Sequence, residues 1–396
     1  MTAGQAAVYV ARPVTSYRLL ALGAGAREVG LVAAAYALLP LFLAIPLGRF
    51  ADRRHGGPLL VVGCATQLLA CLLLSAARSP VTLAGASALL GLGHLALALG
   101  VQNVIARESG DDRHDQHFGL LTAAVSLGQL IGPLLGGLLL GDHRGGALTD
   151  ATTRAMLAAA GVATLATIAA ALAERTRTAG PALAPRGGYD VRQIVRTRGV
   201  PAGIFASIAV LSAADVFTAY MPVLGEQRDI SPGIVGVLLA VRAAASMSGR
   251  IGIGAIVRRV GRLRLITTSA TAAAAAFAGF TLSDNVLLLF VLSALAGFGL
   301  GFGQPLSMTM VVQLVPEQAR ATALAIRLTG NRIGQVAAPA LAGVVAGSGG
   351  AGPVFWLLSG VLLTSAVAVQ RPALKRRLGR REHVPPVEAS AEATLE

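Results

Sequence analysis

Long apolar stretches alternate with short polar segments along the whole chain. Each apolar stretch has about twenty residues or more, and a helix of that length crosses a hydrocarbon core of about 30 Å. Twelve such stretches are present, with ends defined to within several residues. They cover residues 3–22, 29–48, 58–77, 81–106, 119–141, 152–173, 200–223, 233–257, 264–282, 286–313, 321–347 and 352–370. The pattern predicts an all-α membrane protein with twelve transmembrane helices.

The longest polar connection divides these helices into two sets of six. It is rich in arginine, glycine and proline, as expected for a loop outside the membrane. We therefore predict an N-terminal six-helix bundle over residues 1–173, a cytoplasmic central loop over 174–199, a C-terminal six-helix bundle over 200–370 and a cytoplasmic tail over 371–396.

Glycine positions recur between the two predicted bundles at a constant offset of 206 residues. Gly30 corresponds to Gly236, and the same offset carries Gly48, Gly91, Gly93, Gly128 and Pro133 onto identical residues. Because six positions share one register, the chain carries an internal duplication. The two predicted bundles are therefore pseudosymmetric, an arrangement that suits a carrier with alternating access.

Composition and charge agree with a membrane protein. Of 396 residues, 54% are hydrophobic and 13% are charged, a balance typical of polytopic membrane proteins. With a cytoplasmic N-terminus, the cytoplasmic loops and tail hold 22 of the 33 lysines and arginines, and the outer loops hold four. The positive-inside rule then predicts both termini on the cytoplasmic side of a bacterial inner membrane. The net charge of +14 indicates contact with lipid headgroups rather than with nucleic acid.

Residues 128–137 form the most regular stretch of the sequence. Gly128, Gly132 and Gly136 recur every four residues, which places three bare backbone patches on one helix face. Pro133 removes a backbone donor and bends the helix. We predict a kinked helix that packs closely against another helix, and Gly137 is the last residue of this stretch.

Two short basic segments join predicted helices at matching places in the duplication. The first runs from Gly48 through Asp52 and Arg53, and the second runs from Gly254 through Arg258. They resemble the signature loops of the major facilitator superfamily, although Arg258 replaces the acid of the second loop. In that family the acid is thought to latch the two halves on the cytoplasmic side, so the resemblance implies a conformational role for Asp52.

Residues 128–137 also match the superfamily's antiporter motif, G-x-x-x-G-P-x-x-G-G, at every specified position. The resemblance covers nearly the whole chain and implies a transporter similar to drug/proton antiporters. Such exporters usually carry an arginine four residues before a glycine of the fourth helix. Counted back from Gly91, that position is Ser87. Proton coupling must therefore involve other residues, with Asp215 and His94 as the candidates.

Asp215 is the only acid that lies deep in a predicted helix. Arg12 holds the equivalent place in the first helix, because each residue lies five positions before a tyrosine. A charge at mid-membrane costs about 2.5–3.5 kcal/mol on insertion scales and is a functional candidate. We predict an Arg12–Asp215 pair across the midline, which would lessen both costs. Whether it carries protons or is a static ion pair stays open.

Further polar residues lie inside predicted helices. Arg327, Asn331 and Gln335 form one stripe, and Arg332 lies on an adjoining face. We expect Arg242, Arg332 and Asn331 to line a polar cavity, and Arg327 to extend to the inner membrane surface.

His94 is central in the fourth predicted helix. A histidine suits proton handling because it changes charge near neutral pH. The alternative is a hydrogen-bonded histidine that packs between membrane helices, which is the more frequent case.

A membrane prenyltransferase is the remote alternative. Residues 111–115 spell D-D-x-x-D, a spacing that can hold Mg²⁺ against a diphosphate. Such enzymes need a second acidic cluster, and no other loop offers one, so a solvated turn is favoured.

We therefore interpret the sequence as a secondary active transporter for a small organic molecule, and not as an enzyme. Proton-coupled efflux is the first expectation, and proton-coupled uptake by symport is the alternative. The excess of arginine at mid-depth favours an anionic or zwitterionic substrate. We expect no cofactor, no metal and a monomer.

Overall fold

The computed structural model describes residues 1–54, 56–108, 114–175, 191–347 and 349–381, and this part of the chain is helical. Its long helices are α1 (Thr2–Ala21), α2 (Ala26–Arg54), α3 (Gly57–Ala76), α4 (Pro80–Glu108), α5 (His114–Leu140), α6 (Gly145–Arg175), α8 (Val200–Gln227), α9 (Pro232–Ile251), α11 (Arg262–Leu282), α12 (Val286–Gln313), α13 (Arg320–Ala346) and α14 (Ala351–Arg381). The short elements are α7 (Val191–Arg196), α10 (Ile253–Val260) and a 3₁₀ turn at Glu317–Ala319.

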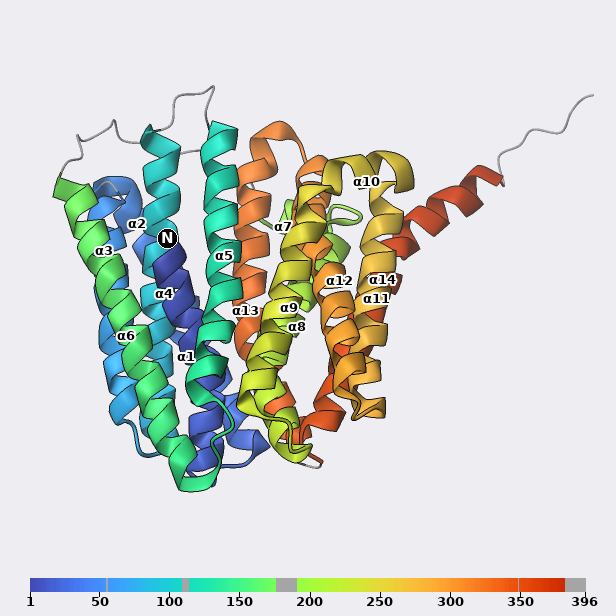
Figure 1. The fold of residues 1–396 in the computed structure, drawn as a ribbon. Coiled ribbons are helices and arrows are strands. Elements are labelled where there is room, and N and C mark those ends of the chain that lie inside the picture. The colour runs from blue at the N-terminus through green and yellow to red at the C-terminus, as the bar shows by residue number, and fades with distance from the viewer. Residues whose placement is uncertain (55, 109–113, 176–190, 348, 382–396) are drawn as a thin grey trace, which may run out of the picture.

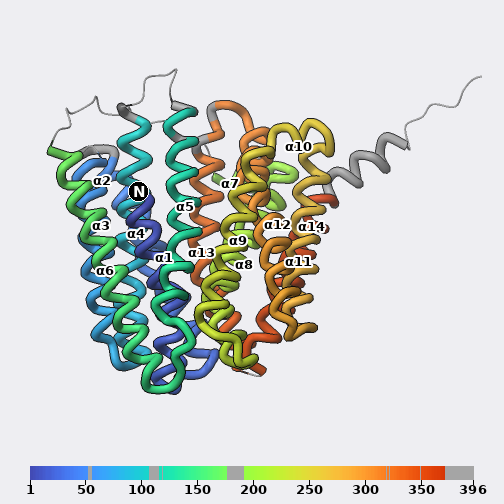
Figure 2. The backbone as a smooth tube through the Cα atoms, in the orientation of Figure 1, coloured from blue at the N-terminus to red at the C-terminus, as the bar shows by residue number. Residues whose placement is uncertain are grey.

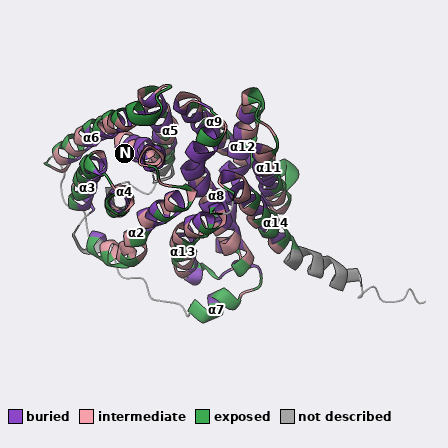
Figure 3. Ribbon diagram, turned by 90° about the horizontal axis from the view of Figure 1, so that it is seen from below, coloured by how far each residue is buried: buried purple, intermediate pink, exposed green. Residues whose placement is uncertain are grey.

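The long helices lie side by side in two groups, which we call the first half (α1–α6) and the second half (α8–α14). Figure 1 shows the first half on the left and the second on the right, and Figures 2 and 3 show the same division. We call the top of Figure 1 the α10 end, after the short helix there. The other end, which carries the turns 22–25, 141–144 and 228–231, is the opposite end.

Ten of the long helices among the described residues are long and apolar enough to cross a membrane. The other two, α1 and α13, cover the predicted spans 3–22 and 321–347. They are as long as the rest but carry arginines within them, at residues 12 and 18 in α1 and at residues 327 and 332 in α13. The all-helical membrane fold is therefore confirmed, and the count of twelve spans stays a prediction.

One predicted helix is broken in two. Residues 233–257 were expected to form a single span, but α9 ends at Ile251 and α10 starts at Ile253. Gly252 lies at the break, and Gly261 ends α10 with φ of +86°, a backbone angle that favours glycine. The second basic segment is therefore a short helix at the α10 end rather than an irregular turn.

Two glycine pairs join the halves near the opposite end. A Cβ built on Gly30 of α2 would lie 2.5 Å from Gly343 Cα of α13, and one built on Gly236 of α9 would lie 2.7 Å from Gly137 Cα of α5. Only glycine lets backbones approach this closely. The 206-residue offset relates one pair to the other, because Gly30 corresponds to Gly236 and Gly137 corresponds to Gly343. The internal duplication thus reappears as a symmetric contact, which we call the glycine seam.

Turn residues add contacts between the halves at the same end. Arg144 Nη1 lies 2.5 Å from Asp229 Oδ1, and its Nη2 donates to the Asp229 carbonyl at 2.8 Å. The backbone N–H of Gly233 donates to the Gly141 carbonyl at 3.1 Å. Both charged side chains are exposed, so the ion pair itself contributes little stability. The seam and these turns together close the opposite end.

Apolar side chains cover the outside of the helices as well as the core. Phe217 packs on Phe277, Phe280 and Phe355 in the second half, with ring centres 5.3–6.0 Å apart. On the outside, Leu138 is 78% exposed, and other large apolar residues are exposed along α2, α3, α6, α12 and α14. A surface of this kind suits lipid tails rather than water.

Candidate functional site

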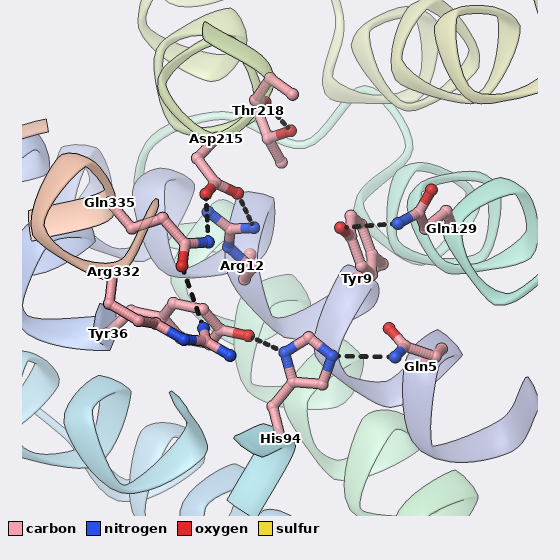
Figure 4. Close-up of polar contacts among 11 residues, drawn as sticks. Gln5, Tyr9, Arg12, Tyr36, His94, Gln129, Asp215, Thr218, Arg332 and Gln335 are labelled. Atoms are coloured by element: carbon pink, nitrogen blue, oxygen red, sulfur yellow. Dashed lines mark hydrogen bonds and ion pairs between the residues drawn. The ribbon is translucent and has the colours of Figure 1, made fainter. Parts of the chain in front are cut away.

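The predicted pair of mid-membrane charges joins the two halves. Arg12 Nη1 of α1 lies 2.6 Å from Asp215 Oδ1 of α8, and the side chains are 11% and 9% exposed. Each charge offsets the cost of burying the other. Figure 4 shows the pair within a larger set of polar side chains from both halves.

The second oxygen of Asp215 is held by its own half. Gln335 Nε2 of α13 donates to Asp215 Oδ2 at 2.7 Å, and Arg332 Nη1 donates to Gln335 Oε1 at 3.0 Å. Asp215 therefore accepts one hydrogen bond from each half, from Arg12 in the first and from Gln335 in the second. Movement of the halves apart would break the Arg12 contact and could leave the Gln335 contact in place.

Tyr36 of α2 links Arg12 to His94. The guanidinium carbon of Arg12 lies 4.6 Å from the centre of the Tyr36 ring, a cation–π distance. The Tyr36 hydroxyl is hydrogen-bonded to His94 Nδ1 of α4, and Gln5 Nε2 of α1 lies 2.8 Å from His94 Nε2. With the Gln5 amide in this orientation, Gln5 Nε2 donates and His94 Nε2 accepts, so the proton of the His94 ring lies on Nδ1. His94 is thus a hydrogen-bonded link between α1, α2 and α4 (Figure 4).

A small cavity lies beside the pair, on the side of the first half. Its volume of about 20 Å³ leaves room for about one water molecule. Arg12, Tyr36 and Ser87 line it, and Ala219 of α8 closes it. Ser87 is the position where the superfamily resemblance would place an arginine, and its hydroxyl keeps this cavity polar without adding a charge.

Arg242 lies on α9 close enough to Arg12, Asp215 and Tyr9 to interact with them electrostatically. Arg242 is 6% exposed, and its guanidinium carbon lies 5.9 Å from the centre of the Phe217 ring. The four charged residues Arg12, Asp215, Arg242 and Arg332 are therefore gathered where the halves meet, and His94 adjoins them from within the first half. We call this set the central region.

Arg327 and Asn331 lie inside the second half. Arg327 is 4% exposed, and its Nη2 donates to Gln304 Oε1 at 2.6 Å and to the Gln304 carbonyl at 3.1 Å. The prediction that Arg327 extends to the membrane surface is wrong, because α12 supplies acceptors in the interior. Asn331 Oδ1 accepts from Ser207 Oγ at 2.9 Å, a contact between α13 and α8.

The glycine face of α5 packs against α1. A Cβ on Gly128 would lie 2.4 Å from Gln5 Cβ, and one on Gly132 would lie 2.6 Å from Tyr9 Cβ. At Gly136 the nearest atom would be 3.4 Å away, an ordinary contact. The predicted close packing is present, and it positions the helix that carries the arginine of the ion pair.

The two signature segments lie at the α10 end, away from the central region. Gly48 of α2 faces open space, and Arg258 of α10 is exposed. The nearest atom to a Cβ on Gly254 is a nitrogen of Arg258, 3.7 Å away. The side chains of Asp52 and Arg53 lie outside the described residues, as do the acidic side chains of the D-D-x-x-D motif at 111–115.

Tyr9, Tyr36 and Gln129 were not among the residues predicted to form the site. Gln129 Nε2 donates to the Tyr9 hydroxyl at 3.0 Å, so α5 is also tied to α1 by polar groups. Uncharged aromatic residues in an apolar stretch resemble ordinary core. The duplication offered one signal, because Tyr36 occupies the place equivalent to Arg242, 206 residues later.

Gly132→Leu should abolish transport while the protein still reaches the membrane. The added side chain would collide with Tyr9 and with the backbone of α1, whose nearest atoms lie 2.6–2.9 Å from the new Cβ. Transport assays and membrane-fraction immunoblots check this. Gly161→Leu is the matched control, because a Cβ there meets nothing within 4 Å. Normal flux in the Gly132 variant would contradict the packing role.

Comparison with known proteins gives the same fold. Crystal structures of the nucleoside transporter NupG are 13% identical to the chain and cover 94% of it and 97% of that protein, with TM-scores of 0.77 for a point mutant and 0.71. A bacterial homologue of the human lysosomal transporter Spinster, in inward-facing unoccupied and occupied conformations, is 15% identical over 96% of each chain, with TM-scores of 0.63 and 0.67. No curated protein matches the chain.

The family comparison covers nearly the full length. The model of the major facilitator superfamily matches residues 3–286 and 203–393. Together with the helical fold and the symmetric glycine seam, this match shows that the chain belongs to the major facilitator superfamily.

Proposed function

We propose that this protein is a proton-coupled secondary transporter that moves a small organic molecule by alternating access. The observation that carries the proposal is the Arg12–Asp215 pair, which joins the two halves at the centre of the molecule. An ionisable residue at this depth is costly and marks substrate or proton pathways. Membership of a transporter superfamily also speaks against the prenyltransferase alternative.

The proposed orientation places the α10 end and both termini in the cytoplasm. The excess of arginine in the segments of that end supports this orientation under the positive-inside rule. The glycine seam and the turns would then close the outer side in the conformation described here. We further propose that the protein works as a monomer in a bacterial cytoplasmic membrane.

Efflux by proton antiport is the proposed direction. Its support is the match of residues 128–137 to the antiporter motif. The second candidate is symport into the cell, and the observation that favours it is the surplus of arginine over acid in the central region, since an anion and a proton could then bind together.

A counterflow experiment tests the proposal. Purified protein in proteoliposomes would be preloaded with unlabelled compounds and assayed for accumulation of radiolabelled ones, with and without a pH gradient. We expect saturable counterflow for at least one compound, and net flux that follows the proton gradient. Antiport predicts that substrate and protons move in opposite directions, and symport predicts the same direction. Flux that does not saturate and ignores the gradient would contradict a coupled carrier.

A further inference from the structure

Arg242 is a buried cation with no hydrogen-bonded partner among the described residues. The residue is 6% exposed, and its Nε is buried with no hydrogen-bond partner among the described residues. The ring of Phe217 lies 5.9 Å away, but a ring contact does not neutralise the charge. Burial of an unpaired cation is expensive, and removal of a partner from such a group is strongly destabilising. Within the part of the chain that the structure describes, Arg242 therefore has no hydrogen-bonded partner, and the acid Asp215 interacts with it only through its charge.

Asp215, the acid that interacts with Arg242 electrostatically, already accepts hydrogen bonds through both of its oxygens. Asp215 accepts from Arg12 through Oδ1 and from Gln335 through Oδ2. Arg332, on α13, uses Nη1 for Gln335 and leaves its other N–H groups available. Among the described residues of the central region, three arginines therefore surround one carboxylate. The surplus positive charge attracts a ligand of opposite sign.

We propose that Arg242 is the anchor for an anionic group, a carboxylate or a phosphate, on the transported molecule. The guanidinium offers a planar set of donors that matches either group through two parallel hydrogen bonds. Arg332 supplies additional positive charge near Asp215, which favours a substrate with net negative charge over a zwitterion. This inference rests on the proposed transport function and narrows its substrate class to organic anions.

Thermal unfolding of the purified full chain in detergent tests the anchor without a proton gradient. The probes are benzoate and phenyl phosphate, with benzamide as the neutral control and benzylammonium as the cationic control. A ligand that binds only the folded state raises Tm, and we expect a rise of about 2 °C or more for at least one anion at saturation. Benzamide and benzylammonium should leave Tm unchanged. The relative effects of the two anions distinguish carboxylate from phosphate.

Two substitutions at one position tie the effect to Arg242. Arg242→Gln should fold, because it removes an unpaired buried charge, and should weaken anion binding at least about tenfold. Arg242→Lys keeps the charge but loses the paired geometry, so an intermediate loss is expected. Arg320→Gln is the control, since that arginine is exposed at the start of α13 and pairs with Glu317, away from Arg242 on α9.

Three results would overturn the proposal: no probe raises Tm, the neutral or cationic probe raises it as much as the anions do, or folded Arg242→Gln or Arg242→Lys responds like the wild type. Should the Gln variant fail to fold, the Lys variant decides. Because the assay measures binding alone, a missing anion effect leaves proton coupling untouched. Conversely, the anions could still raise Tm while transport ignores the proton gradient. That result would refute the proposed coupling and leave the anion site supported.

Discussion

Asp215→Asn should reduce pH-driven transport to background while leaving substrate binding or exchange partly intact. Asparagine keeps the size of the side chain but does not ionise, so it mimics the protonated state permanently. In the conformation described here, the Arg12 guanidinium lies 2.6 Å from the Asp215 carboxylate and supplies its countercharge. When the halves separate, the carboxylate loses its ion pair with Arg12, and the loss of a countercharge favours the neutral form of a carboxyl group. Opening and closing of the central region would thus alternate two protonation states.

The decisive measurement is proton release on substrate addition to detergent-solubilised protein. The wild type should release protons when substrate displaces them, and the Asp215→Asn variant should release none. Asp284→Asn is the matched control, because that acid is 83% exposed at the opposite end and pairs with Arg228. If Asp215→Asn leaves proton release at the wild-type level, Asp215 is structural and His94 becomes the next candidate, to be tested by His94→Gln.

Gly236→Leu should prevent closure of the opposite end and shift the protein toward the alternative conformation. A Cβ at this position lies 2.6 Å from the Pro133 carbonyl and 2.7 Å from Gly137 Cα, so even alanine requires the backbones to move. Gly30→Leu should act in the same way, since its Cβ would lie 2.5 Å from Gly343 Cα. Transport should fall to background in both variants, because the cycle needs the closed state.

Cysteine accessibility measures the expected shift. Ala219→Cys, in a background where the two buried native cysteines are replaced, places a reporter that is 5% exposed in the small cavity beside Arg12. Labelling by a membrane-impermeant maleimide should be slow in this parent and clearly faster when Gly236→Leu or Gly30→Leu is added. Gly360→Leu is the control, because a Cβ there meets open space. Equal labelling in all four proteins would refute the role of the seam in closure.

The duplication shows how far the sequence alone could reach. The 206-residue offset predicted that Gly30 and Gly236 are equivalent, and the seam bears this out in space. A second equivalence, the spacing of five residues before Tyr17 and before Tyr220, placed Arg12 and Asp215 at similar depths, and their pairing was predicted from it. These inferences succeeded because depth in a membrane helix is set by position along the chain, and a sequence records position directly.

Inferences about side-chain direction fared less well. Arg327 was expected at the membrane surface, yet it turns inward to Gln304. Arg18 was not predicted as a buried residue, although it donates to the carbonyls of Ala77, just after α3, and of Thr149, in the first turns of α6. The break at Gly252 was also missed, since the apolar pattern continues across it. In each case the outcome depended on acceptors or backbone angles supplied by other parts of the chain.

The sequence by itself determined the helical membrane class, most helix positions, the repeat and the residues whose charge makes burial costly. Those properties follow from local hydrophobicity, because each stretch partitions into a membrane largely on its own composition. Only the tertiary structure decided that Tyr36 stacks on Arg12 and that His94 bonds to Tyr36 and Gln5. It also decided that no described residue forms a hydrogen bond with Arg242. These contacts depend on which helix faces lie opposite one another, and that choice is made by close packing between distant segments.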